Sequence, residues 1–263
     1  MDLNLENNVA LTTASSSGLG KASAKALARE GANVVINGRS ADRVEEAKSE
    51  ILEAATGEVI GYPGDITDAD AISGLVETTV DEFGGIDHLV ISSGGPPRYR
   101  FPETTDQDWY DAYDLLVMSV VRTVRESQEY LEADGGGSIV NITSRSVKEA
   151  SPTNVLSSSI RLAVIGLEKV LSKELGPEVR ANAVLPGSID TPRVEAGIQS
   201  QIENGIVDSM EEGKALRAES IPIGRIGQPM ELGDMVAFLC SDRAAYINGE
   251  TLLIDGGSSS STL

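Results

Sequence analysis

The feature that most constrains this chain is the regular alternation of short apolar runs with longer segments of helical spacing. Strand-like runs are expected at residues 9–13, 33–37, 58–61, 87–92, 138–143, 179–185 and 250–254. Helical segments are expected at residues 21–30, 40–54, 68–83, 106–130, 154–175 and 230–239. Strands that alternate with helices form right-handed βαβ units, and near-continuous apolar strands are typical of sheets buried on both faces. The pattern predicts an α/β fold for residues 1–263, a single domain built on a doubly wound parallel sheet of about seven strands with helices on both faces.

The charge balance narrows the range of partners. Asp and Glu number 41 against 21 Lys and Arg, which gives a formal net charge of −20. A surface this acidic repels nucleic acids and anionic membranes, so we expect neither as a partner. Few lysines among many acidic residues predict a halophilic protein, kept soluble at high salt. An ordinary acidic protein of the cytosol is the alternative.

The apolar runs, the N-terminal residues and the counts of cysteine and histidine bear on the cellular location of the protein and on metal binding. No apolar run approaches the roughly 18 residues of a membrane span, and the first residues lack the basic start and long apolar region of a secretory signal. We therefore expect a cytoplasmic protein. The single cysteine, Cys240, excludes an internal disulfide framework, and with only one histidine, His88, no transition-metal site is expected.

A glycine-rich turn follows the first expected strand. Gly18 and Gly20 lie between that strand and the next helix, where glycine lets the backbone approach a pyrophosphate and the helix N-terminus offers free N–H groups to the anion. A segment from 188 to about 220 has no clear periodicity and is rich in acidic residues, and we expect it to be irregular.

Several ordered motifs resemble the short-chain dehydrogenase/reductase family over nearly the whole chain, in particular 3-oxoacyl-carrier-protein reductases. The turn TASSSGLG at 13–20 resembles the family's TGxxxGxG, with Ala14 in place of the first glycine. SSGG at 92–95, NITS at 141–144, PGSIDT at 186–191 and IDGG at 254–257 follow in the family's order, as does Asp65 after the third strand. The resemblance implies a Rossmann-type fold that binds a nicotinamide dinucleotide. The cofactor-binding residues it implies are Thr13, Ser15, Ser17, Gly18, Leu19, Gly20, Arg39, Asp65, Ile66, Ser93, Gly94, Arg161, Pro186, Gly187, Ile189 and Thr191.

The end of the second strand bears on which dinucleotide is bound. An acidic residue there would bind the ribose 2′-hydroxyl and repel a 2′-phosphate. This chain has Asn37, Gly38 and Arg39 instead, and the planar fork of an arginine can pair with phosphate. We predict NADP as the cofactor in preference to NAD. In the alternative interpretation, Arg39 is a solvated loop residue.

The catalytic positions implied by the family are partly substituted. In the family a Tyr donates the proton, a Lys lowers the pKa of that Tyr, a Ser binds the carbonyl oxygen and an Asn anchors a water. Aligned on NITS, the Ser falls on Ser144, but the Tyr and Lys positions hold Ser157 and Arg161, and the Asn position falls near Leu116. A serine hydroxyl is a weaker acid than a phenol, and an arginine stays protonated. We predict Ser144, Ser157 and Arg161 as the catalytic residues.

Two classes of function remain open. The first is an NADP-dependent oxidoreductase with a rebuilt proton path, in which Ser157 positions a water, Ser144 and Arg145 stabilise the oxyanion, or Tyr99 or Tyr113 supplies a phenol. The second is a dinucleotide-binding protein without catalysis, acting as a sensor or assembly subunit. The preserved cofactor motifs favour the enzyme.

Cations are concentrated in the segments expected around the nicotinamide. The six are Arg98, Arg100, Arg145, Lys148, Arg161 and Arg193, out of 21 basic residues in the chain. Such a concentration favours an anionic substrate, such as a keto acid or a carrier-linked 3-oxoacyl thioester. Pairing of these cations with nearby acidic residues is the alternative. By resemblance, a substrate lid lies within 188–220, and helices 106–130 and 154–175 pair subunits into a homotetramer or homodimer.

Overall fold

The computed structural model describes residues 1–133 and 135–262 and is built around one parallel sheet. The strand order is β3-β2-β1-β4-β5-β6-β7, and every neighbouring pair is parallel. The strands are β1 (Val9–Thr12), β2 (Asn33–Gly38), β3 (Val59–Pro63), β4 (His88–Ile91), β5 (Gly137–Ile142), β6 (Val179–Pro186) and β7 (Thr251–Ile254). The order reverses between β1 and β4, which confirms the doubly wound Rossmann-type sheet.

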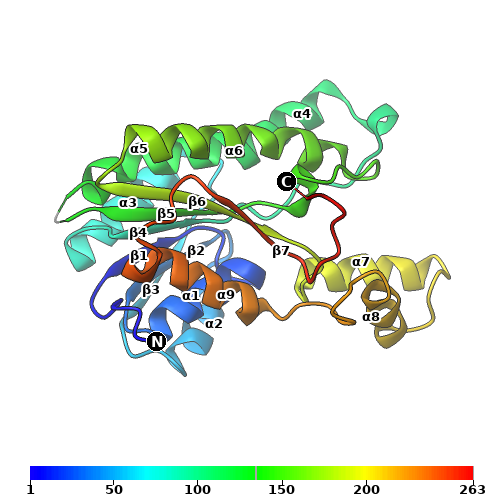
Figure 1. Cartoon of the computed structure of the whole chain (residues 1–263), viewed down its shortest axis with the longest axis horizontal. Helices are drawn as coiled ribbons and strands as arrows, with labels where there is room; N and C mark the ends of the chain where they lie inside the picture. Colours follow the sequence, from blue (N-terminus) through cyan, green and yellow to red (C-terminus); the bar gives the residue numbers. More distant parts are fainter. Residues whose placement is uncertain (134, 263) are drawn as a thin grey trace.

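Helices cover both faces of the sheet (Figure 1). One layer holds α1 (Gly18–Arg29), α2 (Ala41–Leu52) and α9 (Pro229–Cys240), and its apolar side chains form one core cluster with that face. The other layer holds α3 (Ala69–Phe83), α4 (Asp106–Tyr113), α5 (Ser119–Leu131) and α6 (Val155–Glu174), with a second core cluster beneath it. The inner strands β1, β2, β4, β5 and β6 are buried on both faces, as their continuous apolar runs require, whereas the edge strands β3 and β7 are only partly buried.

Local sequence signals set the helix boundaries. The Asp68 side chain accepts a hydrogen bond from the Asp70 backbone N–H at the start of α3, and Gly84 ends that helix in the left-handed conformation, with φ 85°. The helix expected at 106–130 is interrupted, because residues Asp114–Met118 form a π-helical segment between α4 and α5. Leu116 lies in that segment and is buried in the second core cluster.

The expectation of an irregular segment at 188–220 is wrong. Residues Pro192–Glu203 form α7 and Met210–Ala218 form α8, and Figure 1 shows the two helices together beyond the end of the sheet. Proline at the first position suits the start of α7, and the Ser209 hydroxyl caps α8 by accepting from the Glu212 N–H at 3.1 Å. Ile198 is the one hydrophobic side chain of α7 that is fully buried, so the sequence lacked the apolar stripe that identifies a helix.

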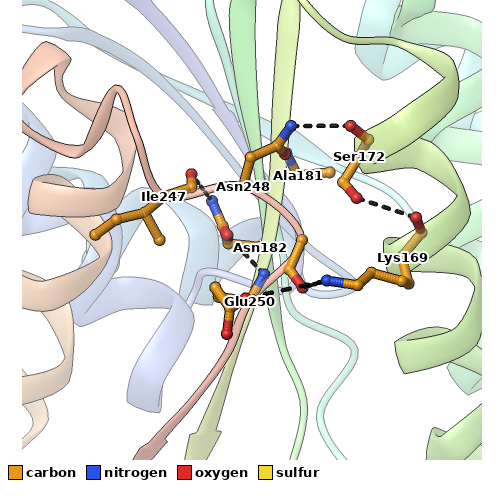
Figure 2. A network of polar contacts seen from close by, with 8 residues as sticks. Lys169, Ser172, Ala181, Asn182, Ile247, Asn248 and Glu250 are labelled. Atoms are coloured by element: carbon orange, nitrogen blue, oxygen red, sulfur yellow. Dashed lines mark hydrogen bonds and ion pairs between the residues drawn. The ribbon is translucent and has the colours of Figure 1, made fainter.

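The last strand is fixed at the sheet edge by a polar network that joins it to α6 and β6 (Figure 2). Lys169 Nζ donates to the Gly249 carbonyl oxygen at 2.6 Å, and Asn248 Nδ2 donates to the Ser172 carbonyl at 2.8 Å. On the β6 side, Asn182 Nδ2 donates to the Ile247 carbonyl at 2.9 Å. The network holds the segment leading into β7 and therefore the position of the residues that follow it.

His88 and Cys240 are both structural. His88 is buried at the start of β4, bonded to Asn8 and Ser138, and burial lowers its pKa to about 3, so that it stays neutral. Cys240 is buried at the end of α9, where burial raises the pKa of its thiol to about 11. Within residues 1–133 and 135–262, no helix is both long and apolar enough to span a membrane.

Candidate active site

A cavity of about 270 Å³ opens at the carboxyl ends of β1, β4, β5 and β6, beside the point where the strand order reverses. This is the place at which doubly wound sheets bind their ligands. The predicted residues that line it are Ser17, Gly18, Leu19, Gly94, Ser144, Ser157, Arg161, Pro186, Gly187, Ile189 and Thr191. The structure therefore brings the turn before α1, the loop after β4, the end of β5, the start of α6 and the loop after β6 around one space.

The turn before α1 fits an anionic group. Gly18 has φ 57°, in the left-handed region, and at Gly20 an added Cβ would lie 2.6 Å from the Ala14 carbonyl oxygen. The Ser17 side chain makes no capping hydrogen bond, so the first N–H groups of α1 remain available to a pyrophosphate. Ala14 itself has φ 43°, a conformation that costs a non-glycine residue about 1–2 kcal/mol. The left-handed turn is therefore kept although its first glycine is replaced.

Thr13 and Ser15 lie behind this turn and hold it in place. The Thr13 hydroxyl donates to the Ser92 carbonyl at 2.7 Å and accepts from the Ser92 N–H at 3.0 Å. The Ser15 hydroxyl donates to the Thr12 carbonyl at 2.7 Å. Both residues are buried outside the cavity lining, so the structure gives them a supporting position.

The expected nucleotide end lies beyond the cavity. Arg39 is exposed just after β2, and Ile66 and Ser93 are buried outside the lining. Asp65 Oδ1 accepts from the backbone N–H of Thr67 at 3.0 Å, which fixes the orientation of that carboxylate. Asn37 Nδ2 donates to the carbonyls of Tyr62 and Gly64, so the residue at the end of β2 is held by β3 and its loop.

A continuous chain of hydroxyls joins the substituted catalytic positions. Ser146 Oγ donates to Ser144 Oγ at 3.0 Å and lies 3.4 Å from Ser157 Oγ, and Arg161 Nε donates to Ser157 Oγ at 3.2 Å. Ser146 is buried in the short 3₁₀ turn Arg145–Val147 after β5. Sequence reasoning missed Ser146, because only the fold brings residues 146 and 157 together.

Arg161 is the electrostatic centre of the site. It is buried, and its guanidinium also donates to the carbonyls of Ile142, at 3.4 Å, and Gly94. Burial, and secondly the charge of Arg193, lower its pKa to about 10, so it remains a cation at neutral pH. The buried cation joins the end of β5 to the loop after β4.

The structure narrows the alternatives for the proton path. Neither Tyr99 nor Tyr113 lines the cavity, since Tyr99 packs against the second core cluster and Tyr113 is about half exposed to solvent. Arg145 does not line it either, since its Nη1 donates to Ser258 Oγ at 2.6 Å. The expected roles of Tyr99, Tyr113 and Arg145 therefore have no support in the geometry.

Three of the six expected cations do not line the cavity, namely Arg100, Arg145 and Lys148. Lys148 lines a separate pocket beside Glu168 and Lys169. Arg98, Arg161 and Arg193 do line the cavity. Arg193 donates to the carbonyls of Gly95 at 3.1 Å and Pro96 at 2.8 Å, which ties the start of α7 to the loop after β4.

A buried carboxyl lies nearby and was also missed. Glu168 on α6 accepts from Asn141 on β5, its Oε1 is buried without a partner, and burial raises its pKa well above its ordinary value. The carboxyl lies outside the cavity lining, and the structure gives it no place in the hydroxyl chain.

Comparisons with known proteins identify the family to which the chain belongs. Residues 13–259 match the family model described as enoyl-(acyl carrier protein) reductase. An oxidoreductase of Methylorubrum extorquens is 36% identical over 96% of this chain and 98% of its own length. The 3-oxoacyl-[acyl-carrier-protein] reductase of Thermotoga maritima is 32% identical over 97% of this chain and 99% of its own.

Among solved structures, L-sorbose reductase from Gluconobacter frateurii, complexed with NADPH and L-sorbose, superposes with a TM-score of 0.94. It is 30% identical and covers 99% of this chain and 100% of its own. The matched motifs, the strand order and these full-length similarities together establish that the chain belongs to the short-chain dehydrogenase/reductase family.

Proposed function

We propose that this protein is an NADP-dependent oxidoreductase that transfers hydride between a nicotinamide and a carbonyl or alcohol carbon. The observation that best supports this is that one cavity joins the anion-binding turn before α1 to the hydroxyl chain that ends at Arg161. A protein that had retained the fold without the activity would not need the anion-binding turn and the hydroxyl chain to line the same cavity. The NADPH in the Gluconobacter reductase supports the choice of dinucleotide.

The chain's own residues suit the cofactor. The N–H groups at the start of α1 would hold the pyrophosphate, and Arg39 would face a 2′-phosphate where an acidic residue would repel it. Pro186, Gly187 and Thr191, all at the cavity, would hold the nicotinamide end. When bound, the dinucleotide supplies or accepts the hydride.

The serines and Arg161 would stabilise charge on the reacting oxygen. Ser144 Oγ lines the cavity and would donate to the carbonyl oxygen. Since Arg161 donates to Ser157 Oγ, the Ser157 proton is free to be donated onward, and the fixed cation favours negative charge at that end of the chain. Arg161 keeps its own proton, so in this proposal the proton delivered to the alkoxide comes from water through the hydroxyls of Ser157, Ser146 and Ser144.

We further propose a small or carrier-linked substrate that is anionic, a keto acid or a 3-oxoacyl thioester, and a cytoplasmic homotetramer or homodimer. The cavity arginines support an anionic group, and α7 and α8 supply the substrate lid. Leu162 and Val170 on α6 are 51% and 53% exposed, which suits a helix that pairs with a second subunit.

A second candidate is a dinucleotide-binding sensor or assembly subunit without catalysis. It is favoured by the absence of any tyrosine from the described cavity lining and by the apolar burial of Leu116. NADPH and NADH titrations at high salt, followed by turnover with keto acids and 3-oxoacyl thioesters, separate the two. Tight NADPH binding with turnover supports the enzyme, whereas tight binding without turnover supports the sensor. Equal affinities for NADPH and NADH would contradict the NADP preference.

A further inference from the structure

Two arginines converge at the lid side of the cavity. Arg98 comes from the loop after β4 and lines the cavity, and Arg217 comes from α8. Both reach the same residue of α7. A Cβ added to Gly197 would lie 3.3 Å from Arg217 Nη2 and 3.7 Å from Arg98 Nη1. Arg217 was not among the cations expected from the sequence, because only the packing of α8 on α7 brings it here.

These guanidinium groups have no carboxylate partner. Among residues 1–133 and 135–262, Arg98 and Arg217 form no ion pair, although the chain has 41 acidic residues. The nearby acids Asp190 and Glu195 are instead paired with Lys214, at 2.7 and 3.8 Å. Arg217 Nε is buried without any hydrogen-bond partner. Buried donors are rarely left unsatisfied, so an unpaired one calls for an external acceptor.

Arg98, Arg193 and Arg217 carry the same charge and lie close enough to affect one another. Burial, and secondly the charge of Arg98, lower the pKa values of Arg193 and Arg217. Like charges held together repel one another unless an anion lies between them. In a chain of net charge −20, this arrangement focuses positive potential at one point of the surface.

We propose that Arg98 and Arg217, held over Gly197 and backed by Arg193, form an anion-binding subsite for a carboxylate or phosphate group of the substrate, remote from the reacting carbonyl. The proposal rests on the proposed function, because it places the carbonyl at Ser144 and the anionic group at the lid. Docking of the anion would draw α7 and α8 toward the loop after β4. A neutral substrate would leave the subsite empty.

The test uses Arg98→Gln and Arg217→Gln, with Arg100→Gln as the matched control, since Arg100 lies in the same loop as Arg98 but neither lines the cavity nor comes close to Gly197. Binding of malonate and of inorganic phosphate to the NADPH-loaded protein is measured by calorimetry at fixed ionic strength in KCl. We expect saturable binding that each subsite variant weakens about tenfold and the control leaves unchanged. Preference for malonate identifies a carboxylate, and preference for phosphate identifies a phosphate ester or a phosphate-bearing carrier.

Kinetics separate failure of the subsite from failure of the enzyme. For an anionic substrate, the variants should raise KM about tenfold and leave kcat and the Kd for NADPH within about twofold. Anion binding that depends on Arg98 and Arg217, without any turnover, would support the proposed subsite and refute the proposed oxidoreductase activity. If neutral ketones are turned over as fast as keto acids, and neither variant changes KM, the oxidoreductase activity is supported and the proposed subsite is overturned.

Discussion

Replacing Arg161 with methionine tests whether its buried guanidinium holds the cavity together. The change removes the donors to Ser157 Oγ and to the carbonyls of Ile142 and Gly94. A buried acceptor left without a donor costs about 2 kcal/mol, or about 4 for Ser157 Oγ and the Ile142 carbonyl together, whereas Gly94 is exposed and water can replace its donor. Against this, the pKa of Arg161 falls from 12.5 to about 10, and a shift of that size corresponds to about 3 kcal/mol of relief when the charge is removed. We expect a net loss of about 1 kcal/mol in the free energy of unfolding.

Thermal unfolding at fixed KCl measures this loss, and about 1 kcal/mol should lower the Tm by about 2–4 °C. Because the cation also stabilises charge at Ser157, kcat/KM should fall by about 10²–10³. Arg161→Lys is the matched variant, since it keeps the charge but carries its donors on one nitrogen. Its Tm and its kcat/KM should lie between those of the methionine variant and those of the parent protein. A methionine variant that is as stable and as active as the parent would refute the reasoning, because charge burial would then outweigh the hydrogen bonds.

Four further predictions concern the hydroxyl chain, the dinucleotide preference, the buried carboxyl of Glu168 and the net charge. Ser146→Ala should lower kcat by about tenfold or more with KM unchanged, since it interrupts the hydroxyl chain, and an unchanged kcat would remove Ser146 from the proton path. Arg39→Ala should raise the Kd for NADPH by about tenfold and leave that for NADH unchanged, as fluorescence titration would measure. The raised pKa of Glu168 means that its contribution to stability is present below pH about 4.5 and is lost as pH rises toward the folded pKa, so Glu168→Gln should stabilise the protein above that range and flatten its pH profile of urea unfolding. Molar KCl should raise the Tm by screening the net charge of −20, and a Tm independent of salt would contradict the high-salt prediction.

The sheet and its covering helices were predictable because burial repeats along the sequence. The strand runs and helix caps, such as Asp68 before α3 and Gly84 after it, place most boundaries within a few residues. Helices α7 and α8 were missed because their stability depends on packing against each other and not on an apolar stripe. In α8 the buried residue is Gly213, whose added Cβ would lie 2.3 Å from Ile198 on α7.

The residues of the candidate site likewise fall into those that a linear motif predicts and those that only the fold brings together. The turn at Gly18 and the loop at Pro186 are linear motifs, so the sequence located them. The positions of Ser146 and Arg217 depend on how distant segments meet, which no spacing in the sequence encodes. Arg145 illustrates the opposite error, since it is adjacent to Ser144 but its side chain reaches Ser258 near the other end of the chain.

The measurement that tests the central claim most directly is isotope transfer from NADPH that carries deuterium at both positions of nicotinamide C4, with the best substrate of the keto acid and thioester panel. Hydride transfer predicts one deuterium on the carbinol carbon of the product, and much slower formation of that product in the Arg161→Met and Ser144→Ala variants. NADPH that binds tightly but never delivers its deuterium to any carbonyl would contradict the oxidoreductase and leave a dinucleotide-binding protein.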